Sequence, residues 1–513
     1  MSEHHYLLAI DQGTTGSTVL ILDVSDKNRP EVLAKVTKEF KQYYPKPAWV
    51  EHDLDDIWES VSGSIEEACS LVEASNVNFT RKQIDGIGIT NQRETLCLVD
   101  RQTRRPVYRA IVWQCKRSAD ICSRLKADGV EALLRDKTGL LIDPYFSGTK
   151  LTWVMENCPH IARRLKEKEV LVGTIDAWLI SQLSQGVSFA TEASNASRTL
   201  LFDIRNGDWD QELLDMLGVP SKDVLPEIKD SADIFATTKG LGFLPDGIPI
   251  SGVLGDQQAA LAGQACFDIG SGKCTYGTGA FLLVNQGDKP ILSKNNLLTT
   301  VAWSVGGKLT YAFEGSAFIA GAALQFLRDQ LGIIETATQS EGLATNVAAA
   351  PELYFVPALA GLGAPHWDPN ARGAFLGLNR GTTNNQLIRA ALEGVALQVC
   401  DLIEAIEADL GHKVERLRVD GGACANNLLM QSQSEFGGFE VDRPLNLETT
   451  AFGAAMMAGL GIGLYESLDN LNNTRKCDKL FLPTNSDEML KYRNEVKAGW
   501  KRAIQAVQMF ARN

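Results

Sequence analysis

A short apolar run that ends in a turn of small residues occurs in both halves of this chain, and it constrains the fold more than any other feature. In the first half, the apolar residues 6–10 lead into Asp11-Gln12-Gly13-Thr14-Thr15-Gly16, and a second apolar run, 19–22, follows. This order predicts a strand, a tight turn and a second strand. In the second half, the turn 276–279 precedes the apolar run 280–284. The recurrence predicts two similar α/β domains with a boundary near 260–270.

Helices and further strands follow from the spacing of apolar residues. Residues 54–68 carry apolar side chains three and four apart, which predicts an amphipathic helix with Asp53 as its N-cap. The same period predicts helices over 318–329 and 386–409. Strands are expected over 84–90, 248–254 and 416–419, each ending in polar or small residues. The last of these leads into a third turn of small residues, 420–427.

Charge and composition exclude several function classes. The 513 residues carry 50 Lys and Arg against 63 Asp and Glu, a net charge of −13 without a long basic run, so nucleic acid and anionic membranes are poor candidates for the main partner. No CxxC or HxxxH pair indicates a zinc site. The N-terminus lacks a secretory signal, and the uncharged stretch 451–465 is too short to span a bilayer. These features predict a cytoplasmic protein.

The sequence contains partial matches to two known active-site motifs, and both matches are incomplete. Gly272-Lys273 resembles the end of a phosphate-binding Walker A loop, but Phe267 stands at its first glycine position and Cys274 at its Ser/Thr position. Residues 147–150 match the SxxK motif of serine β-lactamases and residues 137–139 match KTG, but no Ser-Asp-Asn lies between them. Matches of three or four residues arise by chance in a chain of this length.

The three turns 11–16, 276–279 and 420–427 are candidates for binding the phosphate groups and the base of a nucleotide. Glycine and threonine let main-chain N–H groups approach phosphate oxygens, and Asp11 at a strand end is suited to a hydrated Mg²⁺. The alternative for a single turn is a plain hairpin. Gly321 and Gln325, one helical turn apart, either border a ligand or serve helix packing.

Five further residues carry both a structural and a functional interpretation. Arg93 and Glu94 follow a strand and form either a solvated turn or a fork that binds polyol hydroxyl groups. Asp256 follows another strand, either as a helix N-cap or as a base that takes the proton of an attacking hydroxyl. Trp113 and Tyr145 are either core aromatics or an apolar wall for a sugar-like backbone.

Taken together, these segments resemble the glycerol kinases, a branch of the FGGY family of carbohydrate kinases. The resemblance runs in order over residues 6–465. It rests on the segments 11–16, 88–94 (Gly-Ile-Thr-Asn-Gln-Arg-Glu), 113–115 (Trp-Gln-Cys), 142–150 (Ile-Asp-Pro-Tyr-Phe-Ser-Gly-Thr-Lys), 255–258 (Gly-Asp-Gln-Gln), 275–279 (Thr-Tyr-Gly-Thr-Gly) and 420–426 (Asp-Gly-Gly-Ala-Cys-Ala-Asn). Residues 43–52 and 91–94 are typical of the glycerol kinase branch rather than of the whole family.

The resemblance implies an α/β fold of two actin-like (RNase H-like) ATPase domains with the active site in the cleft between them. Residues 1–263 would form the domain with the glycerol site and the phosphate-binding turn, and residues 264–513 the domain that binds the adenine nucleotide. The implied reaction converts ATP and glycerol into ADP and sn-glycerol 3-phosphate, in glycerol catabolism. The resemblance also suggests a homodimer or homotetramer.

Site residues are carried over from the family onto the matching positions. Asp256 would be the general base, and Asp11 and Asp256 would lie near Mg²⁺. The glycerol contacts would be Arg93, Glu94, Trp113, Tyr145, Asp256, Gln257 and Phe281. The ATP and ADP contacts would be Thr14, Thr15, Gly16, Thr18, Thr278, Gly321, Gln325, Gly422 and Asn426.

One position departs from the family pattern. Many relatives carry arginine where Thr18 stands, so a charged phosphate contact is missing unless another Lys or Arg supplies it. Two alternatives therefore stay beside the main hypothesis. The first is a kinase of the same family for another polyol or a ketose. The second is a nucleotide-binding protein with weak catalysis that acts through partners.

Overall fold

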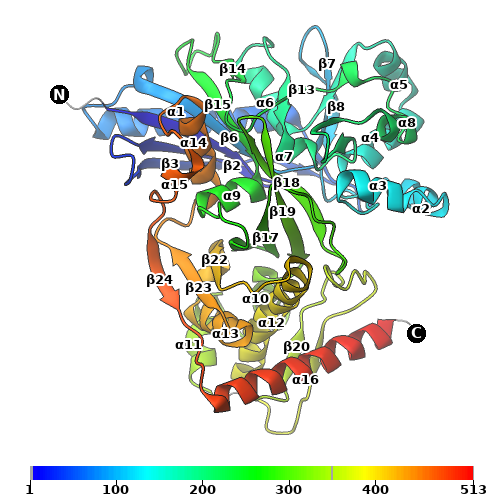
Figure 1. Cartoon of the computed structure of the whole chain (residues 1–513), viewed down its shortest axis with the longest axis vertical. Helices are drawn as coiled ribbons and strands as arrows, with labels where there is room; N and C mark the ends of the chain where they lie inside the picture. Colours follow the sequence, from blue (N-terminus) through cyan, green and yellow to red (C-terminus); the bar gives the residue numbers. More distant parts are fainter. Residues whose placement is uncertain (1–3, 348–349, 512–513) are drawn as a thin grey trace.

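The first of two large mixed sheets holds the N-terminal end of the chain (Figure 1). The computed structural model describes residues 4–347 and 350–511. This sheet has six strands in the order β14-β15-β6-β1-β2-β3, in which β15, β6 and β1 run parallel and the other pairs are antiparallel. In that order their bounds are Ala236–Thr237, Pro249–Gly255, Ile84–Asn91, Tyr6–Gln12, Gly16–Asp23 and Glu31–Glu39.

The second sheet has seven strands in the order β18-β19-β17-β16-β22-β23-β24, with β16, β22 and β23 parallel. In that order their bounds are Leu298–Val305, Lys308–Ala317, Ala280–Gly287, Gly272–Tyr276, Arg416–Asp420, Glu440–Pro444 and Cys477–Phe481.

The two sheets are built around the same core. The antiparallel hairpin β1–β2 is followed across the first sheet by the parallel strands β6 and β15. The hairpin β16–β17 is followed by β22 and β23 in the same way. The predicted α/β class with two similar halves is confirmed, and each hairpin turn falls where the sequence places a turn of small residues.

Shorter strands and the helices complete the fold. A five-stranded sheet has the order β4-β5-β8-β7-β9, with bounds Gln42–Tyr43, Glu51–His52, Pro106–Ile111, Leu96–Asp100 and Val170–Gly173. Three two-stranded sheets are β10 (Ala190–Glu192) with β13 (Glu227–Lys229), β11 (Phe202–Asp203) with β12 (Asp208–Trp209), and β20 (Tyr354–Val356) with β21 (Ala374–Leu376).

The helices α1 to α8 all belong to the first 216 residues. Their bounds are Leu54–Ser75, Ala119–Ala127, Glu131–Thr138, Ser147–Asn157, Pro159–Lys166, Ile175–Leu183, Ala193–Ala196 and Gln211–Met216. The helices α9 to α16 span Asp256–Gly263, Gly321–Asp329, Gln339–Thr345, Asn384–Leu410, Asn427–Gly437, Thr449–Gly461, Leu468–Leu471 and Asp487–Ala511. Short 3₁₀ helices are η1 (Arg81–Gln83), η2 (Lys222–Val224) and η3 (Gly422–Ala425).

Most predicted elements lie close to where they were expected, although α1 continues seven residues beyond the predicted end at 68 and α10 begins later than predicted. Asp53 caps α1 by accepting from the N–H of Asp55 at 3.2 Å. The helix predicted from 318 begins at Gly321, because β19 continues to Ala317 and the N–H groups of Ala320 and Gly321 bond to the 276–279 turn.

The uncharged stretch 451–465 is largely the buried helix α14, which packs against the first sheet. Its residues share a hydrophobic cluster with β1 and β2. The approach is so close that a Cβ at Gly88 of β6 would lie 2.1 Å from the carbonyl oxygen of Ala454. Among the described residues, no helix is long and apolar enough to cross a membrane. The helix α14 therefore joins the C-terminal half of the chain to the first sheet.

The hairpin β18–β19 makes a second connection between the halves. Leu298, Val301 and Tyr311 of this hairpin belong to a hydrophobic cluster whose other buried members all come from residues 50–225. Figure 1 shows the hairpin passing from the second sheet toward the elements of the first half. This placement brings Glu314 of β19 into contact with Arg93, which follows β6.

Candidate active site

The tight turn between β1 and β2 (residues 11–16), for which phosphate binding was predicted and which is called the phosphate turn below, is partly exposed. The N–H of Gly13 bonds to the carbonyl of Gly16 at 2.9 Å, and Thr15 between them is exposed. Thr18 lies directly opposite Asp11 in the β1–β2 ladder, so their side chains share one face of the sheet. The Thr18 hydroxyl pairs with that of Thr37 at 2.9 Å.

The turn 276–279 is joined to the start of α10. The N–H of Gly321 donates to the carbonyl of Gly277 at 2.9 Å, and the N–H groups of Ala320 and Ala322 donate to the carbonyl of Thr278. A Cβ at Gly321 would lie 2.7 Å from the carbonyl oxygen of Gly277, so this contact requires glycine. Thr278 and Gln325 are both exposed.

The turn 420–427 lies against the previous one. Gly421 has a φ of 85°, and a Cβ there would lie 2.6 Å from the carbonyl oxygen of Tyr276. Gly422 is exposed, and a Cβ there would meet no protein atom within 4 Å. Asn426 caps α13, since its side chain accepts from the N–H of Leu429 at 2.9 Å and donates to the Ser340 hydroxyl at 3.1 Å.

The start of α14 contacts both β3 and the end of β22. Glu448, its N-cap residue, forms an ion pair with Lys35 of β3. The next residue, Thr449, donates its hydroxyl proton to Asp420 at 2.7 Å, at the end of β22. Glu448 is also close enough to Asp11 to influence its ionisation. The start of α14 therefore lies between the first sheet and the 420–427 turn.

Asp11 lies near the end of β1, and Asp256 follows the end of β15, two strands away in the same sheet and near enough for its charge to act on Asp11. Asp256 is the first residue of α9 and Gly255 is its N-cap, so the interpretation of Asp256 as a helix cap is wrong. Burial, and then the nearby carboxylates of Asp256 and Glu448, raise the pKa of Asp11 to about 8, while the charge of Lys35 opposes the rise. Two carboxylates that repel each other in this way form a favourable place for a cation.

Arg93 and Glu94 are buried, which excludes the solvated-turn interpretation. They are 2% and 1% exposed, and Glu94 has a φ of 58°, a conformation uncommon outside glycine. The Nε of Arg93 lies 3.1 Å from Oδ1 of Asp256. That same oxygen accepts from the N–H of Gln257 at 2.7 Å, whereas Oδ2 of Asp256 has no hydrogen bond to any described residue. One Asp256 oxygen is thus held and the other is left for a ligand.

Trp113 and Tyr145 are half-buried and pack against the core of the first half, and their outer faces form an aromatic surface near this pair, called the wall below. Their rings meet edge to face, with centroids 5.5 Å apart. The indole N–H of Trp113 donates to the Thr14 hydroxyl at 3.0 Å, which ties the wall to the phosphate turn. The guanidinium of Arg198 lies 5.6 Å from the centre of the Tyr145 ring. Six of the seven residues predicted to bind glycerol therefore belong to one connected group, in which each member touches another member or is its neighbour in the chain.

Phe281 joins the same group through Lys273, a residue that sequence reasoning had considered only as part of a failed Walker A match. The buried Nζ of Lys273 bonds to Oε1 of Gln257 and, at 2.8 Å, to the Thr275 hydroxyl. It also lies 3.5 Å from the carbonyl oxygen of Phe281. Burial lowers the pKa of Lys273.

Glu314 and Arg198 also belong to the site and were missed. Glu314 accepts from both Nη atoms of Arg93, at 2.6 and 3.0 Å, and from Nη2 of Arg198 at 3.0 Å. The Nε of Arg198 donates to Glu94 at 2.6 Å. Burial alone would raise the pKa of Glu314, but the two guanidinium groups overcome it and hold the pKa at about 2. The signal in the sequence was an acidic residue inside the apolar strand 309–317.

His52 supports the phosphate turn from behind. Its Nε2 lies 2.5 Å from Oε1 of Gln42, whose Nε2 donates to the carbonyl of Thr14 at 3.0 Å. Its Nδ1 lies 3.3 Å from Nε2 of Gln92, which also donates to the carbonyl of Gly13 at 3.2 Å. This pattern fits a neutral ring with its proton on Nε2. Burial accordingly lowers the pKa of His52 to about 4.

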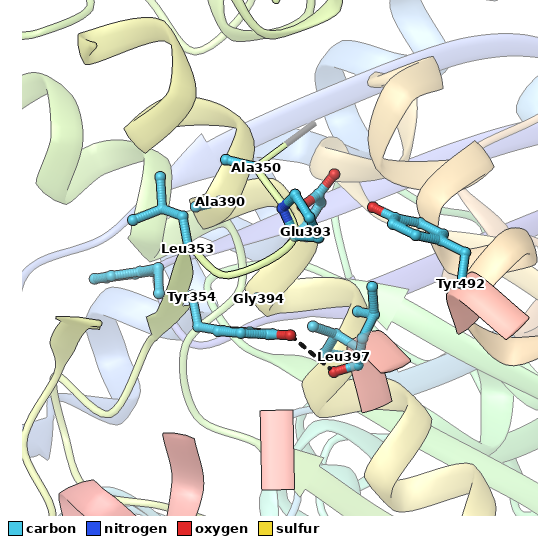
Figure 2. A pocket seen from close by; sticks show the side chains of 11 residues that line it. Ala350, Leu353, Tyr354, Ala390, Glu393, Gly394, Leu397 and Tyr492 are labelled. Carbon is cyan, nitrogen blue, oxygen red and sulfur yellow. Dashed lines mark hydrogen bonds between the residues drawn. The ribbon is translucent and has the colours of Figure 1, made fainter. Parts of the chain in front are cut away.

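No cluster of three or more His, Cys, Asp or Glu with metal-binding geometry occurs among the described residues. A cavity in the second half, shown in Figure 2, is also separate from the site. It lies between the start of β20, α12 and α16, has about 10 Å³ of free volume, and is crossed by a bond from the Tyr354 hydroxyl to the carbonyl of Val496. Its size suits one water molecule, and none of the predicted site residues line it.

Comparisons with known proteins cover nearly the whole chain. Residues 6–263 match the N-terminal domain, and residues 272–462 the C-terminal domain, of the FGGY family of carbohydrate kinases. A glycerol kinase of Myxococcus xanthus is 49% identical over 98% of this chain and 100% of its own length. A glycerol kinase of Carboxydothermus hydrogenoformans is 50% identical over 97% of both chains. The crystal structure of Plasmodium falciparum glycerol kinase with ADP superposes with a TM-score of 0.91 at 33% identity, covering 98% of both chains.

Proposed function

This chain belongs to the FGGY family of carbohydrate kinases, and we propose that it transfers the terminal phosphoryl group of ATP to glycerol, giving ADP and sn-glycerol 3-phosphate. The observation that carries the proposal is the position of Asp256. It is held by Arg93 through one oxygen, with the other oxygen unbonded, next to the carboxylate of Asp11. Residues 1–263 form the domain with the glycerol site and the phosphate-binding turn, and residues 264–513 the domain that binds the adenine nucleotide.

Glycerol binds among Arg93, Glu94, Trp113, Tyr145, Asp256, Gln257 and Phe281. A neutral triol offers only hydroxyl groups, so its site must supply a donor or acceptor for each of them. A buried donor or acceptor of the site that finds no hydroxyl partner costs about 1–3 kcal/mol. Arg93 retains one N–H on Nη2 beyond its bonds to Glu314, and Asp256 retains Oδ2. Trp113 and Tyr145 cover the carbon chain. This pairing selects a triol over its deoxy analogues.

The nucleotide binds along the three turns, at Thr14, Thr15, Gly16, Thr18, Thr278, Gly321, Gln325, Gly422 and Asn426. Exposed threonines and main-chain N–H groups suit the phosphate tail, and the open backbone at Gly422 suits a flat ring. Asn426 contributes by fixing the turn, because both ends of its amide are already bonded.

Asp256 acts as the general base in the proposed reaction. Oδ2 of Asp256 takes the proton of the attacking glycerol hydroxyl. The glycerol oxygen forms a bond to the γ-phosphorus, and the bond between this phosphorus and the leaving ADP oxygen breaks. Arg93 and the Gln257 N–H keep the carboxylate in place through Oδ1. The chain's contribution is mainly alignment and stabilisation of charge.

Asp11 and Asp256 would hold the Mg²⁺ that accompanies ATP. Mg²⁺ takes one or two carboxylates and fills its remaining positions with water and phosphate oxygens, which fits a site without a larger acidic cluster. The raised pKa of Asp11 beside Asp256 supports this assignment, since a cation relieves the repulsion between them. When bound, the ion neutralises charge on the phosphate oxygens.

The cellular setting is part of the same proposal. The protein acts in the cytoplasm in glycerol catabolism and assembles as a homodimer or homotetramer. The family resemblance and the composition support these assignments.

An ADP-release assay tests the function directly. The protein is incubated with MgATP and, in separate reactions, glycerol, ribitol, xylulose or no acceptor, and the chirality of the phosphorylated product is determined. We expect glycerol to give the highest kcat/KM and sn-glycerol 3-phosphate as the product. A higher kcat/KM for xylulose would make this a ketose kinase, and ADP release that does not depend on any acceptor would refute the proposal.

A further inference from the structure

One buried carboxylate from the second sheet binds two arginines of the first half. Glu314 of β19 is fully buried. Its two oxygens accept from Nη1 and Nη2 of Arg93, and one of them also accepts from Nη2 of Arg198. Arg93 is fork-bound, a geometry that fixes the plane of the guanidinium as well as its position.

Each arginine directs its Nε to a site carboxylate, while Nη1 of Arg198 has no hydrogen-bond partner among the described residues. With both Nη atoms on Glu314, Arg93 has Nε directed to Asp256 at 3.1 Å. With Nη2 on Glu314, Arg198 has Nε directed to Glu94 at 2.6 Å. The side chains Asp256, Arg93, Glu314, Arg198 and Glu94 thus form one chain with Glu314 at its centre.

We propose that Glu314 is a positioning residue of the glycerol site, which aims Arg93 at Asp256 and Arg198 at Glu94 and so fixes both carboxylates that face the triol. The inference rests on the proposed function. It assigns to Glu314 no contact with the substrate, because its oxygens are occupied by the two guanidinium groups.

Charge balance gives the physical reason. Two buried guanidinium groups face the three carboxylates of Asp256, Glu94 and Glu314. Glu314 alone accepts three hydrogen bonds from these guanidinium groups. If Glu314 lost its charge, Arg93 would turn its two Nη atoms toward the nearest remaining carboxylate, Asp256. A fork on Asp256 would engage Oδ2, the oxygen that the proposed reaction needs. Glu314 remains ionised in the folded protein because both arginines hold its pKa at about 2.

The test compares Glu314→Gln, Glu314→Asp and a control. Asp442 is the control because it also receives a two-pronged bond from a buried arginine, Arg475, at 2.7 and 2.9 Å, away from the glycerol contacts. For each variant, kcat and KM are measured for glycerol at saturating ATP and for ATP at saturating glycerol. The midpoint of thermal unfolding is measured in parallel.

We expect Glu314→Gln to lower kcat/KM for glycerol by about tenfold or more, with KM for ATP within about twofold of the wild-type value. Glu314→Asp keeps the charge and recovers part of the loss. Asp442→Asn lowers the unfolding midpoint but leaves kcat/KM for glycerol unchanged. Arg198→Lys keeps the charge but replaces the Nε and Nη2 that bridge Glu94 and Glu314 with a single nitrogen. It is the substitute if Glu314→Gln does not fold, and it should also lower kcat/KM for glycerol.

Two results overturn the inference. One is a folded Glu314→Gln variant, or Arg198→Lys in its place, with wild-type kcat and KM for glycerol. The other is an equal loss in Glu314→Gln and Asp442→Asn, which would indicate a general effect of removing a buried ion pair. Failure of the proposed function is recognised separately, because the wild-type protein would then show no glycerol-dependent turnover; the same comparison is then made with the acceptor that it does use.

Discussion

The folded state should lose stability in mildly acidic solution because His52 is held neutral there while the unfolded chain takes up a proton. The neutral ring accepts at Nδ1 and donates at Nε2, and both neighbours in turn bond to carbonyls of the phosphate turn. A proton on Nδ1 would place two donors, His52 and Gln92, against each other. Burial lowers the pKa of His52 from 6.5 to about 4.

The sign and size of the effect follow from these two values. Between pH 6.5 and 4 the unfolded chain binds a proton at His52 and the folded chain does not, so the free energy of unfolding falls as the pH falls. From pH 7 to pH 5 the loss amounts to about 2 kcal/mol. Below pH 4 both states are protonated and the loss stops growing.

The assay is urea unfolding of the wild-type protein and of His52→Gln at pH 7 and pH 5. Glutamine does not titrate, so the difference in unfolding free energy between the two proteins should change by about 2 kcal/mol between these pH values. His412→Gln, at an exposed histidine, serves as the control and should follow the wild-type protein. Equal pH dependence in wild-type and His52→Gln would refute the reasoning.

Three substitutions test other parts of the site. Gly422→Ala places a methyl group where no protein atom lies within 4 Å, so the unfolding midpoint should stay unchanged. The methyl group would occupy space that the proposed nucleotide needs, so KM for ATP should rise by roughly tenfold. An unchanged KM would mean that the nucleotide does not approach this backbone. Thr18→Arg adds a cation opposite Asp11 and should lower KM for ATP or raise kcat by about tenfold, and no change in either would count against a missing charge. Lys273→Met removes the donor to Gln257 and should cost about 1–3 kcal/mol in kcat/KM for glycerol, whereas kinetics within twofold of wild type would exclude that role.

Local features of the fold were predictable because they depend on neighbouring residues. The strands and turns around Asp11 and Thr278 combine apolar runs with glycine and threonine, which leaves few other local structures. The start of α10 was misplaced because residues 318–320 continue the apolar pattern. What ends the strand there is bonding to the 276–279 turn, a contact between segments that no local pattern records.

The chain of ion pairs at the site was not predictable from the sequence, because it too depends on contacts between segments that are far apart in the chain. Glu314 is 221 residues from Arg93, and Arg198 is 104 residues from Glu94. No residue pattern near Glu314 or Arg198 in the sequence indicates which residue each of them pairs with. An acidic residue within an apolar strand does indicate a buried charge, and a buried charge requires a partner, but the identity of that partner is set by how β18–β19 packs into the first half.

The central claim is that Asp256 takes the proton of the attacking hydroxyl, and Asp256→Asn tests it most directly. The asparagine keeps the shape of the side chain and an oxygen that accepts hydrogen bonds, but it does not act as a base. With glycerol and MgATP saturating, kcat should fall by about 100- to 10,000-fold, while KM for glycerol changes far less. A folded Asp256→Asn protein whose kcat stays within about threefold of the wild-type value would contradict the account.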